Sequence, residues 1–206
     1  MDGFVAVTLL RHGLTEKNSR NAYIGWTDDP LSKEGEEQLR GMQIHRPDLV
    51  VTSGMTRANQ TADILFPEIN PTRIQQIKEL NFGKWEGLTY EDLKEDPAYR
   101  EWVENADRIA PPGGETFTQF KARIMEGWGI IHREMTNKTI GSALVVSHGG
   151  PIRQLLTELG DYSRSFWEWP VHPGTGYKLT WTFESFRRGE RCISLQEVPA
   201  MAKQNG

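Results

Sequence analysis

Two histidines and two arginines, Arg11 and Arg57, lie at or just after the ends of three separate apolar runs of the chain. The run VAVTLL leads into Arg11 and His12, and the run SALVVS leads into His148 and two glycines, with Arg153 shortly after. A third run, LVVTSG, precedes Arg57. Each residue alone is weak evidence, because such tripeptides are usually ordinary turns and a single histidine usually has a structural role. Their shared position at the ends of apolar runs favours one common site.

These side chains are suited to binding a phosphoryl group. Guanidinium groups match the oxygen geometry of phosphate and stay charged at every physiological pH. A cation at the start of a helix, as expected for Arg57, is opposed by the helix dipole, which suggests a bound anion. An imidazole can attack phosphorus and form a covalent intermediate. We predict that His12 is this nucleophile.

A metal site is the alternative use of two histidines. The sequence contains no HExxH motif, and arginines beside the histidines would repel a divalent cation. We therefore expect neither a metal nor any other cofactor.

Five segments, in their order and spacing, resemble the histidine phosphatase superfamily, in the branch of cofactor-dependent phosphoglycerate mutases and related phosphatases. They are LLRHGLTEKN, TSGMTRANQTA, IKELNFGKWEG, APPGGET and VVSHGGPIR. The resemblance covers nearly the whole chain, and the five motifs together are specific although each alone is not. It implies that His12 becomes phosphorylated. It also implies that Arg11, Arg57 and His148 hold the phosphoryl group.

The resemblance further implies a proton donor and a set of binding residues. Glu79 would protonate the leaving oxygen and later deprotonate the attacking water. Physics alone could not select it, since most glutamates are solvated surface groups. Asn18 closes the first motif, and the N–H of Gly149 is expected to face the phosphate. The expected substrate- and phosphate-binding set is Arg11, Asn18, Ile24, Gly25, Arg57, His148 and Gly149.

Strand-like and helical patterns alternate along the chain, which predicts a three-layer α/β/α sandwich around a mostly parallel sheet. Ligands of such sheets bind in a crevice beyond the carboxyl ends of the strands, so the site residues should converge there. The expected strands lie near 4–10, 49–53, 72–76, 142–147, 176–184 and 191–198, and the expected helices near 32–44, 56–65, 116–136 and 151–159.

The helix expected over 116–136 carries an apolar stripe at steps of three or four residues, which predicts a face buried in the core rather than a ligand site. Its members are Phe117, Phe120, Ile124, Trp128, Ile131 and Met135. Gly127 and Gly129 each cost about 1 kcal/mol relative to alanine in a helix, which makes a kink there plausible.

Residues 83–115 interrupt the alternation, and the resemblance implies that this insert forms a helical or loop lid over the site. Its aromatic residues could line the entrance or pack the insert onto the body; they are Trp85, Tyr90, Tyr99 and Trp102. A second aromatic cluster could be a substrate wall, a dimer patch or core; it comprises Phe166, Trp167 and Trp169. The remaining histidines are expected on the surface: His45, His132 and His172.

Composition is typical of a cytoplasmic enzyme with one domain over residues 1–206. The lone Cys192 excludes an internal disulfide. A net charge of -4, from 24 Lys and Arg against 28 Asp and Glu, argues against nucleic acid as a partner. The N-terminal MDGFVAVTLL matches neither a signal peptide nor a membrane span. We expect a monomer or homodimer whose partner is a small-molecule phosphomonoester.

Four positions depart from the mutase pattern. Phe82 stands where mutases have a tyrosine, and Tyr90 where they have a lysine. Val103 and Glu104 fall about where paired arginines hold the mutase substrate's carboxylate, and each such bond is worth about 1.5 to 3 kcal/mol. The insert is also shorter than a mutase's, so water should reach the phosphohistidine and hydrolysis should prevail.

We therefore predict a metal-independent phosphomonoesterase of the histidine acid phosphatase type. Two alternatives stay open: a cofactor-dependent phosphoglycerate mutase, and a phosphate-ligand binding or regulatory protein without turnover. The intact catalytic positions disfavour the binding protein; they are Arg11, His12, Arg57, Glu79 and His148. Candidate substrates include sugar phosphates, nucleotides and α-ribazole phosphate, and an aromatic entrance would suit a flat or apolar leaving group.

Overall fold

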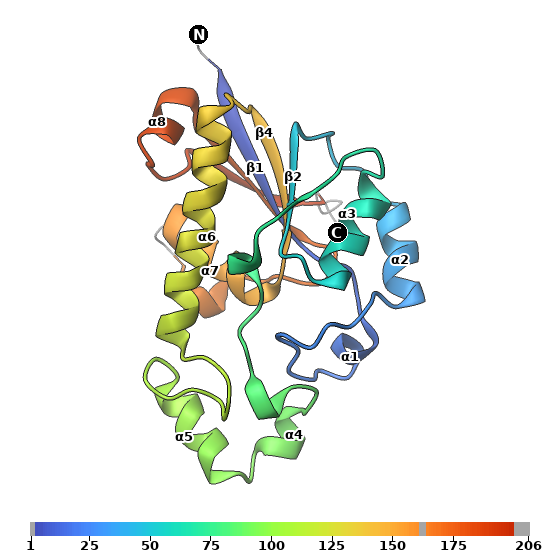
Figure 1. Ribbon diagram of the computed structural model, residues 1–206, viewed down its shortest axis with the longest axis vertical. Coiled ribbons are helices and arrows are strands. Elements are labelled where there is room, and N and C mark those ends of the chain that lie inside the picture. The colour runs from blue at the N-terminus through green and yellow to red at the C-terminus, as the bar shows by residue number, and fades with distance from the viewer. Residues whose placement is uncertain (1–2, 161–163, 200–206) are drawn as a thin grey trace, which may run out of the picture.

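A six-stranded sheet with helices on both faces forms the body of the computed structural model, which describes residues 3–160 and 164–199 (Figure 1). The strands occur in the order β3-β2-β4-β1-β5-β6. Their bounds are β1 Phe4–Arg11, β2 Leu49–Thr52, β3 Thr72–Arg73, β4 Ser142–Ser147, β5 Gly176–Thr182 and β6 Ser194–Val198. Strand β5 alone runs antiparallel to both its neighbours, and the other pairs are parallel. The predicted α/β architecture with a mostly parallel sheet is confirmed.

Eight α-helices flank or extend this sheet in the described residues. They are α1 Glu16–Ser19, α2 Lys33–Arg40, α3 Thr56–Leu65, α4 Tyr90–Leu93, α5 Pro97–Asn105, α6 Phe117–Asn137, α7 Gly149–Leu159 and α8 Phe183–Arg187. The helix expected over 32–44 is shorter than predicted, because Ser32 caps its start and Gly41 ends it. The strand expected over 72–76 gives way after two residues to a 3₁₀ turn at Gln75–Ile77.

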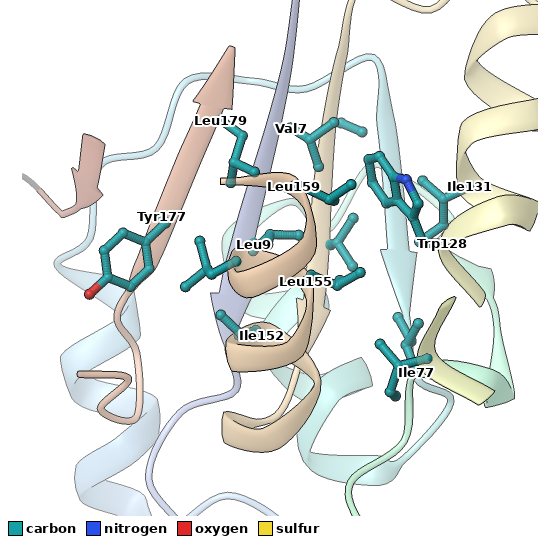
Figure 2. Close-up of a cluster of buried hydrophobic side chains, with 14 of the residues drawn as sticks. Val7, Leu9, Ile77, Trp128, Ile131, Ile152, Leu155, Leu159, Tyr177 and Leu179 are labelled. Atoms are coloured by element: carbon teal, nitrogen blue, oxygen red, sulfur yellow. The ribbon is translucent and has the colours of Figure 1, made fainter. Parts of the chain in front are cut away.

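Alternating side chains of the strands supply two cores, one on each face of the sheet. On one face, Val7 and Leu9 pack against apolar side chains of α6 and α7. Figure 2 shows this core, with Ile152 and Leu155 of α7 facing the strands. On the other face, Leu10 packs with Ala58 and other residues of α3.

Helix α6 runs as one unbroken helix from Phe117 to Asn137, through both Gly127 and Gly129. A capping box between Thr116 and Gln119 fixes its start. Gly127 is required by packing, because a Cβ there would lie 2.8 Å from Ile77 Cγ2 and 2.9 Å from Gln76 Cβ. The glycine therefore lets α6 approach the 3₁₀ turn that precedes Glu79.

The expectation of a surface position is wrong for one histidine. His132 is half-buried, its Nε2 lies 2.6 Å from the carbonyl oxygen of Phe186, and its ring packs against that phenylalanine. A helix position facing α8 removes this side chain from solvent. His45 and His172 are exposed, as predicted.

The insert gathers around its own small aromatic core. Trp85, Leu93 and Tyr99 are buried there, with Tyr23 and Trp102 packed against them. In Figure 1, α4 and α5 lie beyond the end of the sheet at which β1 finishes. Across residues 3–160 and 164–199, none of the helices combines the length and the apolar character of a membrane span.

Candidate active site

The ends of two adjacent strands place His12 and His148 side by side. In the parallel pair β1 and β4, Arg11 is in register with Ser147, and each histidine is the next residue along its strand. The backbone N–H of His12 donates to the carbonyl oxygen of Ser147 at 3.0 Å. The two imidazole rings are 5.0 Å apart between centroids, so the predicted convergence of these histidines is confirmed.

Arg57 joins the two histidines from the first turn of α3. Its side chain is completely buried, and its Nε–H lies 3.2 Å from His12 Nε2 and 3.3 Å from His148 Nδ1. The two terminal nitrogens donate to the carbonyl oxygens of Thr27 (2.8 Å) and Gly25 (2.7 Å). The guanidinium is therefore held in one orientation by backbone on one side and faces both imidazoles on the other.

An anion already lies at the start of α3. The carboxylate of Asp28 accepts the backbone N–H and the hydroxyl of Thr56 at 2.7 and 2.8 Å. It offsets part of the opposition between Arg57 and the helix dipole. Asp28 can therefore account for a cation at the start of α3 without a bound phosphate. The position of Arg57 alone is thus weaker evidence for a bound anion than the sequence suggested.

The contacts of His12 fix its tautomer and its charge. Nδ1 lies 2.7 Å from the carbonyl oxygen of Gly13, which can only accept, so Nδ1 carries the hydrogen. Nε2 keeps its lone pair, toward which Arg57 points. Burial, reinforced by the positive charges of Arg57 and Arg11, lowers the pKa of His12 well below its ordinary value. A neutral imidazole with a free Nε2 is the form required of a nucleophile.

His148 is neutral for the same reasons. Its Nδ1 accepts from Arg57, so its Nε2–H donates to the hydroxyl of Ser53 at 2.8 Å. Burial, with the nearby charge of Arg57, lowers the pKa of His148 well below its ordinary value.

Arg11 supplies a second guanidinium with unused donor capacity. One terminal nitrogen donates to the carbonyl oxygen of Val171 at 2.8 Å. Its Nε is buried and has no hydrogen-bond partner within the described part of the chain. Burial lowers the pKa of Arg11 to about 10, which leaves it cationic at neutral pH. A buried cationic donor without a partner is costly unless an anion binds.

Glu79 lies close to Arg11 in space and contacts the N-terminus of α7. Its carboxylate accepts the backbone N–H groups of Leu80 (2.9 Å) and Gly150 (3.0 Å). A Cβ at Gly150 would lie 2.2 Å from Glu79 Oε1, so any side chain there would displace this carboxylate. A Cβ at Gly149 would lie 3.8 Å from Glu79 Oε2 and 3.9 Å from Arg11 Cζ. Gly149, the first residue of α7, therefore lies between the carboxylate and the guanidinium.

The other predicted binding residues are placed less uniformly. Gly25 joins the site through the bond of its carbonyl oxygen with Arg57. Asn18 lies in α1, half-buried, with an Oδ1 that is buried and has no partner among the residues described. Ile24 is buried. No hydrogen bond described for Asn18 or Ile24 links either one to the histidines or Arg57.

Reasoning from sequence missed Glu86. Its carboxylate accepts four backbone N–H groups, at 2.8 to 3.1 Å, from Gly25, Trp26, Thr27 and Phe82. It thereby fixes the segment whose carbonyl oxygens hold Arg57. No local signal marks this role, because three of the four partners lie about sixty residues earlier in the chain.

A largely aromatic cavity of about 370 Å³ borders Glu79 and Gly150. Tyr99, Trp102, Phe166 and Trp167 line it, whereas Trp85 is core to the insert and Trp169 is buried in the body. Tyr90 is exposed and outside the cavity. All six members of the apolar stripe of α6 belong to or pack against the core, and the first two, Phe117 and Phe120, also line the cavity. The expectation that this stripe is a face buried in the core is confirmed.

A larger cavity, of about 620 Å³, lies beside β6 and contains none of the residues assigned to phosphate chemistry. In the described ranges, no three His, Cys, Asp or Glu side chains are grouped as a metal site would require.

Comparison with known proteins places these features in a family. The model of the histidine phosphatase superfamily (branch 1) matches residues 7–189. An adenosylcobalamin/alpha-ribazole phosphatase of Escherichia coli is 32% identical over 176 residues, which cover 81% of this chain and 85% of that protein. A 2,3-bisphosphoglycerate-dependent phosphoglycerate mutase of Beijerinckia indica is 28% identical over 169 residues, covering 74% and 80%. The crystal structure of the alpha-ribazole phosphatase of Shigella flexneri superposes with a TM-score of 0.74 at 28% identity, covering 85% of this chain and 90% of that one.

Proposed function

Because the chain belongs to branch 1 of the histidine phosphatase superfamily, we propose that it is a phosphomonoesterase that hydrolyses a small organic phosphate through a phosphohistidine on His12. The observation that carries the proposal is the contact of the buried Arg57 with both His12 Nε2 and His148. It directs a cation at the nitrogen that attacks, where phosphate oxygens gain charge in the transition state.

In the first step, the lone pair of His12 Nε2 attacks phosphorus and the phosphorus–oxygen bond of the ester breaks. The bonding electrons stay on the ester oxygen, which takes a proton from Glu79 and leaves as an alcohol. Arg11 and Arg57 stabilise the phosphoryl oxygens, and the Gly149 N–H at the start of α7 is placed to help them. The hydrogen bond from His12 Nδ1 to Gly13 steadies the ring as it becomes positively charged.

In the second step, the Glu79 carboxylate takes a proton from a water molecule that attacks the phosphohistidine. The nitrogen–phosphorus bond breaks, its electrons return to Nε2, and inorganic phosphate leaves. Glu79 is then protonated and ready to serve the next ester. Its place between the guanidiniums and the aromatic cavity supports this role, because the leaving oxygen must lie between phosphate and alcohol.

We propose that the insert at 83–115 forms a lid over this site. The lid and the body together form a single domain in this proposal. Its Tyr99 and Trp102 form one wall of the cavity beside Glu79. A cover there would limit how far water enters around the phosphohistidine and would choose which alcohols fit.

A mutase is the second candidate, because phosphoglycerate mutases are among the relatives and share the phosphohistidine step. A mutase must hold the carboxylate of its substrate. Only one cation, Arg153, is among the residues that line the cavity, and Val103 lies there without a charge. This lining favours the phosphatase.

Release of inorganic phosphate from a panel of phosphomonoesters, in the presence of a chelator, tests the proposal. We expect turnover by the wild type and a loss of at least about 1,000-fold in His12→Ala. An acid-labile phosphoenzyme should be trapped in the wild type and be absent from the variant. His172→Ala, which removes an exposed histidine, is the matched control and should keep full activity.

Two results would overturn the proposal. A phosphoenzyme that isomerises a phosphoglycerate but releases almost no phosphate would identify a mutase. No labelling and no release with any ester would indicate a binding protein.

A further inference from the structure

We infer that the alcohol released by this enzyme carries an uncharged aromatic or similarly flat apolar group, which binds in the aromatic cavity beside Glu79. The inference rests on the proposed function, since the cavity is read as the site of the leaving group. It narrows the substrate from any small phosphomonoester to one with a ring system attached.

The cavity is continuous with the catalytic residues. Glu79 and Gly150 form part of its wall, and the same carboxylate accepts the Gly150 N–H. A group bonded to the ester oxygen that Glu79 protonates would therefore enter this space. Its volume, about 370 Å³, lies within the range of about 300 to 1,000 Å³ that is usual for small-molecule sites.

Aromatic rings from three segments line the space. Trp102 comes from the insert, Phe117 from the start of α6, and Trp167 from the 3₁₀ turn at Phe166–Glu168. Phe117 and Trp167 are nearly parallel, at 11° with centroids 6.0 Å apart. Such faces bind flat rings by stacking and by removing apolar surface from water.

The mouth of the cavity leaves large apolar side chains in solvent. Trp167 is 72% exposed and Val103 is 57% exposed, and both line the cavity. Apolar side chains clustered at a hollow mark a ligand site more often than those scattered singly over a surface. A ring bound in the cavity against Trp167 would cover this surface.

Charge on the cavity wall is sparse and nearly balanced. Glu79 and Arg153 are the charged residues that line it, and Arg153 already donates its Nε–H to the carbonyl oxygen of Trp169 at 3.0 Å. The hydroxyls of Tyr23 and Tyr99 are bonded to each other, and burial raises the pKa of Tyr23, which keeps it neutral. A second anionic group would find little compensation here, so the bound moiety is uncharged.

The decisive measurement compares two primary alkyl esters, naphthylethyl phosphate and glycerol phosphate. In both esters the leaving group is a primary alcohol, so their intrinsic reactivity is similar and the ratio of kcat/KM reports binding of the alcohol. We expect the naphthyl ester to be favoured by about 10- to 100-fold, as burial of a fused ring predicts.

Variants at the exposed mouth then test the cavity itself. Trp167→Ala should lower that ratio about 10-fold, mainly through a lower kcat/KM for the naphthyl ester. Val103→Arg should also lower it, and should raise relative turnover of phosphoglycerate. Tyr90→Ala is the control, because Tyr90 is an exposed aromatic of the same insert that lies outside the cavity. Circular dichroism confirms that each variant is folded.

The outcomes separate the two proposals. Hydrolysis of both esters at equal kcat/KM overturns the inference and leaves the phosphatase intact. A naphthyl preference that Trp167→Ala and Val103→Arg do not change overturns it as well, because selection then lies elsewhere. Failure to hydrolyse any ester overturns the proposed function itself.

Discussion

The neutrality of His12 and His148 is produced by their surroundings. Both rings are buried, and the cations Arg57 and Arg11 lie close enough to disfavour a further positive charge. A histidine in water is protonated below pH 6.5 and loses its nucleophilic lone pair. Burial among arginines therefore keeps the proposed nucleophile, Nε2 of His12, unprotonated in mildly acidic as well as neutral solution.

This arrangement predicts how stability depends on pH. Below the ordinary pKa of 6.5, the unfolded chain binds protons at His12 and His148 that the folded protein does not bind. Acidification therefore favours unfolding, and the free energy of unfolding should fall below pH 6.5 by up to about 1.4 kcal/mol per pH unit for each histidine. Urea denaturation at pH values on either side of 6.5 measures this slope.

The variant His148→Asn should reduce the slope by about half, whatever it does to stability at neutral pH. His172→Asn, at an exposed position, should leave the slope unchanged. Equal slopes in the wild type and His148→Asn would show that the buried ring is not the source of the effect.

At the scale of elements, the segment after α1 is built to hold Arg57. Glu86 binds the backbone N–H groups of residues 25–27, and the carbonyl oxygens of Gly25 and Thr27 bind the guanidinium in turn. Glu86 is thus a positioning residue that acts on His12 through Arg57. Removing its charge weakens these hydrogen bonds and frees the segment.

We expect Glu86→Gln to lower kcat by about 10-fold or more. If Glu86 acts through Arg57, the effect should shrink in an Arg57→Ala background, so a double-mutant cycle on kcat measures the coupling. Glu101→Gln, at an exposed position of the insert, is the control. Purely additive losses in the double variant would contradict the positioning role.

The glycines of α6 offer a paired test of packing against helix propensity. At Gly127 a Cβ would press on Ile77 and Gln76, so Gly127→Ala should destabilise by about 1 to 3 kcal/mol despite the better helix former. At Gly129 the nearest atom is the flexible end of Arg133 at 3.4 Å, so Gly129→Ala should stabilise by about 0.5 to 1 kcal/mol.

Unfolding free energies from denaturant curves measure both changes. The reverse order of stability would show that α6 and the 3₁₀ turn before Glu79 are not in close contact in solution.

At the scale of the whole molecule, the proposed phosphate site draws on four segments that are far apart in the chain. His12 follows β1, His148 follows β4, Arg57 lies on α3, and Glu79 lies between β3 and the insert. No part of the chain makes the site alone. A phosphate that binds the folded protein but not the unfolded chain must therefore stabilise the entire fold.

Inorganic phosphate should raise Tm, with a gain of about 2.7 kcal/mol at a concentration one hundred times Kd. Calorimetry with phosphate, against chloride at equal ionic strength, measures the effect. Arg57→Ala should abolish most of the gain, because it removes the buried cation between the histidines. An equal rise in chloride would show a salt effect without a site.

Much of the fold could be predicted from local pattern. The strand ends before Arg11, Arg57 and His148 are predictable because each apolar run and the glycine-containing turn after it are adjacent in the sequence. The stripe on α6 was identified for the same reason. Glu79 required the family resemblance, since one glutamate among many has no local signature of catalysis.

The sequence by itself therefore determined the architecture and the types of residue that meet at the strand ends. Only the tertiary structure decided that one nitrogen of Arg57 faces both histidines, that Glu86 holds it there, and which aromatic rings face the cavity. Trp85 and Trp102 occur in the same insert, yet one fills its core and the other lines the cavity. Such contacts join residues tens of positions apart, and their geometry depends on how whole elements pack, which no local pattern encodes.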